Sequence, residues 1–245
     1  KYFSNLNADS KLNDRILARI PADAALVIEF TNERSIYEIF KDYTLFADII
    51  GNGQQSKLER LKETLSGNQE LAELFNEQKV YLSFHHDKDS LSFLWVSMLN
   101  EPVADERLSF LLGKTAIVGK SGKYSSIAIK GINEPFYFFR DDNVVAGSFS
   151  LAVLQKSSEL KETQLSPRFK EQLSRQTAGS KNSIRNQYVD YSTVMPFLSK
   201  FYRTKLTGHY NLINELDGVS NLNMNFRSDA LMFNGITEID TTKGS

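Results

Sequence analysis

Cysteine is absent from this 245-residue chain, and tryptophan occurs only once. The absence of cysteine excludes disulfides, thiol catalysis and thiolate metal sites together. Five prolines and 13 glycines leave little material for a disordered linker. The sequence also lacks a run of about eighteen apolar residues, the length at which a segment becomes a candidate membrane-spanning helix.

What the chain does contain is ordinary globular material, with 41% hydrophobic and 24% charged residues. Aromatic residues are plentiful, with 17 Phe and 10 Tyr, and they favour packed sheets. We therefore predict an α+β fold, in which antiparallel β-sheet packs against helices. We expect a single domain over 1–245, cut from a longer polypeptide, with possible sub-units at 20–100 and 186–240.

A hairpin at 80–99 is the clearest structural unit. Val80, Leu82 and Phe84 alternate with polar residues, as expected for a strand with one buried face. The second strand is apolar on both faces, because Phe93 and Trp95 alternate with further apolar residues. That pattern predicts a central strand.

A similar hairpin is expected at 219–239, and each hairpin follows a short strand and a helical segment. The short strands are predicted at Ala24–Phe30 and Gln187–Tyr191. In the hairpins, Ser90–Phe93 aligns with Ala230–Phe233. An old internal duplication and a chance recurrence of the same order both explain this similarity.

Several helix starts carry capping signals. A capping box at Ser56–Glu59 predicts one helix, and Asn68 and Ser150 are candidate caps for two more. Ser166-Pro167 marks another start, because proline is favoured at the first helical position. Further helices are expected where apolar residues recur at helical spacing: 12–20, 36–43, 105–112 and 193–202.

Candidate reactive centres were weighed against structural explanations. We do not expect His85-His86-Asp87 to bind a metal ion, because adjacent strand residues point to opposite faces of the sheet. We expect these residues to be a polar strand end entering a turn. Gly113-Lys-Thr115 and Gly119-Lys-Ser121 lack the first glycine of a phosphate loop. We therefore predict no catalytic residue, no metal and no cofactor.

Basic residues are concentrated between 166 and 205. This window has eight basic and two acidic residues, so it carries +6 while the whole chain carries −1. A solvated surface is the favoured interpretation. The alternative is a site for an anionic ligand such as a lipid head group, a polysaccharide or, least favoured, a nucleic acid. The residues of that possible site are Arg168, Lys170, Arg175, Lys181, Arg185, Lys200, Arg203 and Lys205.

Four stretches together resemble a family of exported, membrane-anchored bacterial proteins whose function is not established. They are Ile20–Glu29, Val80–His86, Phe136–Ser148 with its following helix, and Gln187–Phe197. The resemblance implies an N-terminal membrane anchor outside this chain and a periplasmic or cell-envelope location. It assigns no catalytic residues.

The sequence therefore favours a periplasm-facing, non-catalytic interaction or scaffold domain with a protein or envelope partner. The anionic-ligand module is the first alternative. An enzyme whose residues converge only in three dimensions is the second.

Overall fold

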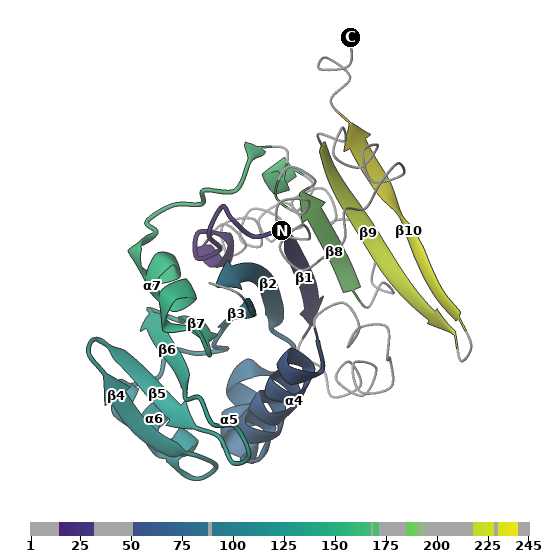
Figure 1. Cartoon of the computed structure of the whole chain (residues 1–245). Coiled ribbons are helices and arrows are strands. Elements are labelled where there is room, and N and C mark those ends of the chain that lie inside the picture. Colours follow the sequence, from purple (N-terminus) through teal and green to yellow (C-terminus); the bar gives the residue numbers. More distant parts are fainter. Residues whose placement is uncertain are drawn as a thin grey trace, which may run out of the picture.

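The computed structural model describes residues 15–31, 51–87, 90–167, 169–171, 185–190, 193, 218–227 and 230–239. Ten strands form one sheet in the order β10-β9-β8-β1-β2-β3-β7-β6-β5-β4. Every adjacent pair is antiparallel, and β4 and β10 stand at the two ends (Figure 1). The predicted α+β fold with antiparallel sheet is confirmed.

The strands are β1 (Leu26–Thr31), β2 (Lys79–Asp87), β3 (Ser90–Met98), β4 (Ile117–Ser121), β5 (Tyr124–Ala128), β6 (Phe136–Asp141), β7 (Val144–Ser148), β8 (Arg185–Asp190), β9 (Gly218–Arg227) and β10 (Ala230–Ile239). The labelled helices are α4 (Asn52–Ser66), α5 (Gln69–Phe75), α6 (Asp105–Gly113) and α7 (Leu151–Glu159). Residues 15–17 and 169–171 are also helical.

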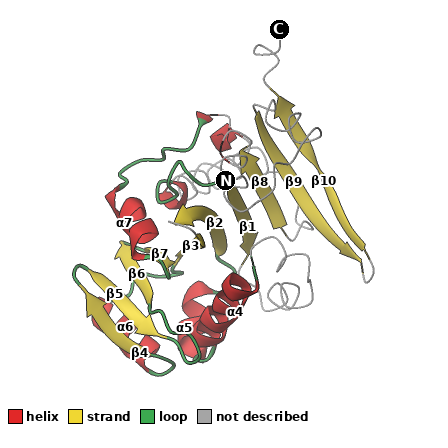
Figure 2. Cartoon of the chain, viewed as in Figure 1, coloured by secondary structure: helices red, strands yellow, loops and turns green. Residues whose placement is uncertain are grey.

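Helical segments cover both faces of the central sheet (Figure 2). On the first face, α4, α5 and α6 pack against alternate residues of the central strands, including Leu82 and Trp95. On the second face, Ile20, Leu154 of α7 and Phe169 pack against the intervening residues, such as Val96. Two hydrophobic cores therefore sandwich the sheet, as the two-faced apolar pattern of β3 requires.

Several sequence-based expectations hold in detail. Strand β3 lies between β2 and β7, in the interior of the sheet. The Asn68 side chain accepts a hydrogen bond from the Leu71 amide and caps α5, and Ser150 caps α7 in the same way. Helix α4 differs, because it begins at Asn52, four residues before the predicted capping box, and its N-cap residue Gly51 offers no side chain. The predicted helices at 36–43 and 193–202 lie outside the described residues, apart from Thr193.

The two hairpins occupy equivalent places about the β1–β8 junction. Strand β1 pairs with the β2–β3 hairpin on one side, and β8 pairs with the β9–β10 hairpin on the other. The closing pairs are Asp87–Ser90 and Arg227–Ala230, so a shift of 140 positions superimposes one hairpin register on the other. The six strands β10-β9-β8-β1-β2-β3 therefore have a local two-fold arrangement, which favours duplication over coincidence.

Gly147 of β7 gives a stability prediction, because a Cβ at that position would lie 2.3 Å from Cζ of the buried Phe136 ring. We expect Gly147→Ala to lower the free energy of unfolding by about 1–3 kcal/mol, since the ring is held by its neighbours. Gly53→Ala is the control, because nothing lies within 4 Å of the added Cβ there. Urea unfolding measures both; equal effects would contradict this packing.

Candidate functional site

A row of polar side chains runs along one face of β2, and it is the most distinctive chemical feature of the described residues. Lys79, Tyr81, Ser83 and His85 alternate with Val80, Leu82 and Phe84, so they share the second face of the sheet. Tyr81, Ser83 and His85 are at most 1% exposed. Burial of so many polar groups requires partners for each of them.

Ser83, His85 and Asp23 form the first cluster. The Ser83 Oγ lies 2.8 Å from His85 Nε2, and His85 Nδ1 lies 2.9 Å from Asp23 Oδ1. An ionised Asp23 accepts but cannot donate, so Nδ1 carries a proton in this contact. Lys156 of α7 completes the cluster, because its Nζ donates to Asp23 Oδ2 at 2.7 Å.

The order of hydrogen bonds from serine through histidine to aspartate is that of the catalytic triad of serine hydrolases. The surroundings of Ser83 argue against that use. Ser83 and His85 have no exposed surface, and Ser83 stands between Val27 of β1 and Leu94 of β3 in the sheet. A nucleophile must approach a substrate carbonyl to within about 3–3.5 Å. In the present packing, the cluster instead joins β2 to the segment before β1 and to α7.

The carboxyl group of Asp23 has a perturbed pKa. Hydrogen bonding to His85, supported by Lys156, holds the pKa of Asp23 well below its usual range, although partial burial opposes the shift. A lowered pKa means that the ionised form stabilises the folded state above about pH 4, where the unfolded carboxyl is ionised. That stabilisation disappears as the pH falls through the folded-state pKa.

We therefore expect Asp23→Asn to cost about 1 kcal/mol of folding free energy at pH 7, a modest value because the carboxyl is half-exposed. The cost should shrink between pH 5 and pH 3. Urea unfolding of the two proteins at pH 5 and at pH 3 measures this change in cost. Asp142→Asn is the control, because this exposed carboxylate pairs with the exposed Arg15 at the surface. An Asp23→Asn effect that is the same at both pH values would refute the assignment.

Glu29 of β1 organises the second cluster on this face. Glu29 is 7% exposed, and its carboxylate accepts a hydrogen bond from the Tyr188 hydroxyl at 3.1 Å and pairs with Lys79 Nζ at 2.9 Å. The Tyr81 hydroxyl also donates a hydrogen bond to Glu29. Burial, together with the nearby Glu29 carboxylate, raises the pKa of that hydroxyl well above its usual value. The cluster links β8, β1 and β2, and so crosses the two-fold junction of the sheet.

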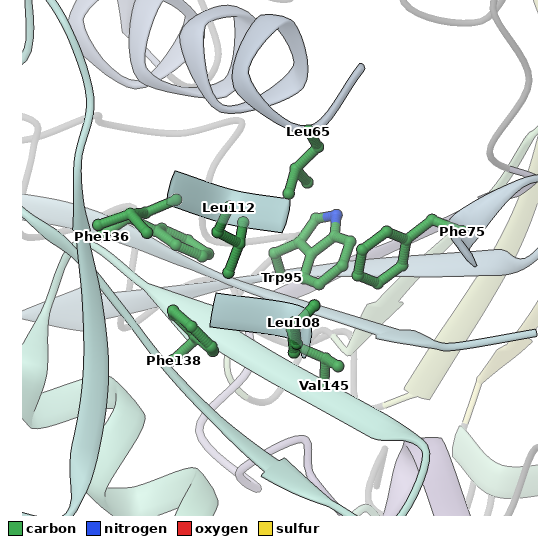
Figure 3. Close-up of a pocket in the computed structure, with 9 residues that line it drawn as sticks. Leu65, Phe75, Trp95, Leu108, Leu112, Phe136, Phe138 and Val145 are labelled. Carbon is green, nitrogen blue, oxygen red and sulfur yellow. The ribbon is translucent and has the colours of Figure 1, made fainter. Parts of the chain in front are cut away.

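An apolar cavity of about 20 Å³ lies on the other face, between the sheet and α4, α5 and α6. Trp95 and Phe75 meet edge to face at its centre, with ring centroids 5.4 Å apart (Figure 3). Leu65, Leu108 and Leu112 approach from the helices. The cavity has the size of about one water molecule, and its nine lining residues are all apolar, so it offers a polar ligand no anchoring group.

The candidate residues predicted from the sequence, where the structure describes them, lie in different parts of the fold. His85, His86 and Asp87 end β2, as the sequence predicted, but His85 is fully buried, which the sequence did not indicate. Asp87 Oδ2 accepts a hydrogen bond from Ser150 Oγ at the start of α7. Of the eight basic residues, Lys170 lies half-buried in a helical turn and Arg185 starts β8. The other six fall outside the described residues, and the anionic-ligand site stays a prediction.

Sequence reasoning missed Asp23 and Glu29 as the partners of buried polar groups. Asp23 lies 62 positions from His85, and Tyr188 lies 159 positions from Glu29. A charged residue within the apolar run at 24–30 was the one available signal for Glu29, since such a residue needs a partner when buried. No comparable local signal marked Asp23.

Within the parts of the chain that the structure describes, no group of three or more His, Cys, Asp or Glu side chains is placed to hold a metal ion. In those same parts, no helix combines the length and the apolar character needed to cross a membrane.

Comparison with known proteins gives little further guidance. No protein-family model and no curated protein matches the chain. Among solved structures, crystal form I of TP0453 is similar, with a TM-score of 0.45 and 14% sequence identity over 89% of this chain and 75% of that chain. At this level of similarity, nothing about activity transfers.

Proposed function

We propose that this chain is a non-catalytic interaction domain that binds a protein partner through the exposed parts of its sheet and helices. The observation that carries the proposal is the burial of Ser83 and His85, the two residues that most resemble part of a catalytic site. Ser83 and His85 have no exposed surface, and both ring nitrogens of His85 are occupied by protein partners. Polar groups held in this way fix a packing arrangement.

Large apolar side chains lie on the surface instead. Phe110 of α6 is 66% exposed, Ile117 of β4 is 77% exposed and Ile236 of β10 is 60% exposed. Two of the three are on the terminal strands of the sheet, and each terminal strand pairs along one edge only among the described residues. Their positions support binding through sheet edges. The resemblance to exported, membrane-anchored proteins supports a periplasmic or envelope location for this interaction.

Turnover measurements test the proposal. The chain is assayed against a panel of esters, amides and thioesters, with Ser83→Ala as the matched variant. We expect no turnover above background and no difference between the two proteins. Turnover by the unmodified chain that is lost in Ser83→Ala would refute the proposal and establish the enzyme alternative.

A further inference from the structure

We infer that the outer edge of β10 pairs with β10 of a second copy of this chain, in an antiparallel dimer that extends the sheet across a two-fold axis. The inference deepens the proposed function and rests on it, because it names the partner and the edge. It starts from the equivalence of the two hairpins.

The edge of β3 that faces away from β2 is paired with another antiparallel strand. Residues Leu94–Met98 of β3 pair with β7 on the side opposite β2. The shift of 140 positions that relates the hairpins places Asn234–Glu238 of β10 at the equivalent edge. Among the described residues, β10 pairs only with β9. The edge of β10 thus corresponds to a position that is occupied by an antiparallel strand in the first half.

The solvent exposure of these edge residues differs from that of their counterparts in β3. Residues 234–237 are all exposed, on both faces of the strand. Ile236 corresponds to Val96, which is fully buried, yet 60% of Ile236 is exposed. A β-branched residue that is exposed here and buried at its counterpart is the type of residue that an added strand would cover.

The composition of β10 selects the occupant. From Ala230 to Thr237 the strand has no charge and no proline, the two features that commonly protect an edge from pairing. A second β10 suits this edge, because it is uncharged over the same Ala230–Thr237 stretch and has the same length. The other terminal strand, β4, has five residues against ten and carries Lys120.

Charge also suits a two-fold pairing. With Ile236 opposite its own copy, Glu238 stands opposite Asn234 rather than opposite the other Glu238. The two Glu238 positions are then four residues apart along the strands, about 13 Å at the rise of an antiparallel strand. Like charges are kept apart, and each subunit uses the same patch, as a closed dimer requires.

The experiment uses the absence of cysteine from the chain. Ile236→Cys is oxidised in solution, and directly opposite residues of an antiparallel pair are close enough for a disulfide. We expect a covalent dimer of Ile236→Cys, and no comparable dimer of Ile117→Cys on β4. Sedimentation equilibrium of the unmodified chain should give twice the chain mass of 27.8 kDa.

Ile236→Lys should halve the sedimenting mass without changing the circular dichroism spectrum of the folded chain, because the residue is exposed within one subunit. Ile117→Lys should leave the dimer intact. A monomeric unmodified chain would overturn the inference. So would a dimer that survives Ile236→Lys, equal cross-linking of Ile117→Cys, or open-ended oligomers abolished by Ile117→Lys, which indicate β10–β4 pairing. Failure here leaves the absence of turnover untouched, whereas turnover lost in Ser83→Ala overturns the proposed function even in a dimer.

Discussion

Trp95→Ala is expected to lower the free energy of unfolding by about 3–5 kcal/mol, the range for removing a large aromatic from a core. Trp95 is 2% exposed and lies in the middle of β3, under α5 and α6. Its ring meets Phe75 edge to face, and it already borders a small cavity that the substitution would enlarge. The surrounding helices are packed on several other side chains, so they cannot close fully over the space.

Urea unfolding measures this loss. Circular dichroism is the signal monitored, because Trp95→Ala removes the only tryptophan and therefore its fluorescence. Phe110→Ala is the matched control, because it truncates an aromatic residue that is 66% exposed, and we expect it to change stability by less than about 0.5 kcal/mol. Similar costs for the two variants would contradict the placement of Trp95 in the first core.

The second large effect is expected at Glu29, where Glu29→Ala should cost about 3–4 kcal/mol. The substitution removes the acceptor of the buried Tyr81 and Tyr188 hydroxyls and the partner of Lys79. An unsatisfied buried hydroxyl costs about 1–3 kcal/mol, and breaking a buried ion pair adds to that loss. Lys79 is a third exposed, so its ammonium group can reach water and moderates the effect.

Glu134→Ala provides the control for Glu29→Ala. It also removes a glutamate paired with a lysine, Lys57, but the carboxylate is largely exposed and should contribute less than about 0.5 kcal/mol. Adding Tyr81→Phe and Tyr188→Phe to Glu29→Ala should recover part of the stability, because the orphaned hydroxyls are then gone. A Glu29→Ala cost no larger than that of Glu134→Ala would refute the cluster.

Local features of the fold were predictable from the sequence because they depend on neighbouring residues. The alternation in β2, the two-faced apolar pattern of β3 and the caps at Asn68 and Ser150 are all set within a few positions. The start of α4 was misplaced because the Ser56–Glu59 pattern, although it matches a capping box, lies inside the helix.

Features that depend on distant pairing were not predictable in the same way. The similarity of the two hairpins was visible, but the placement of β8 beside β1, which makes them equivalent, is set by long-range pairing. The burial of His85 follows from Asp23 and Lys156, which approach from separate segments. A polar residue near a strand end has no local signal that distinguishes such a cluster from a solvated turn.

The central proposal is that the Ser83–His85–Asp23 cluster stabilises the fold and has no catalytic role. Intact-mass spectrometry after treatment with a fluorophosphonate tests it most directly, because an activated serine nucleophile is covalently modified by such a reagent. We predict that the mass of the folded chain stays unchanged. Stoichiometric modification that maps to Ser83 and is lost in His85→Ala would contradict the account.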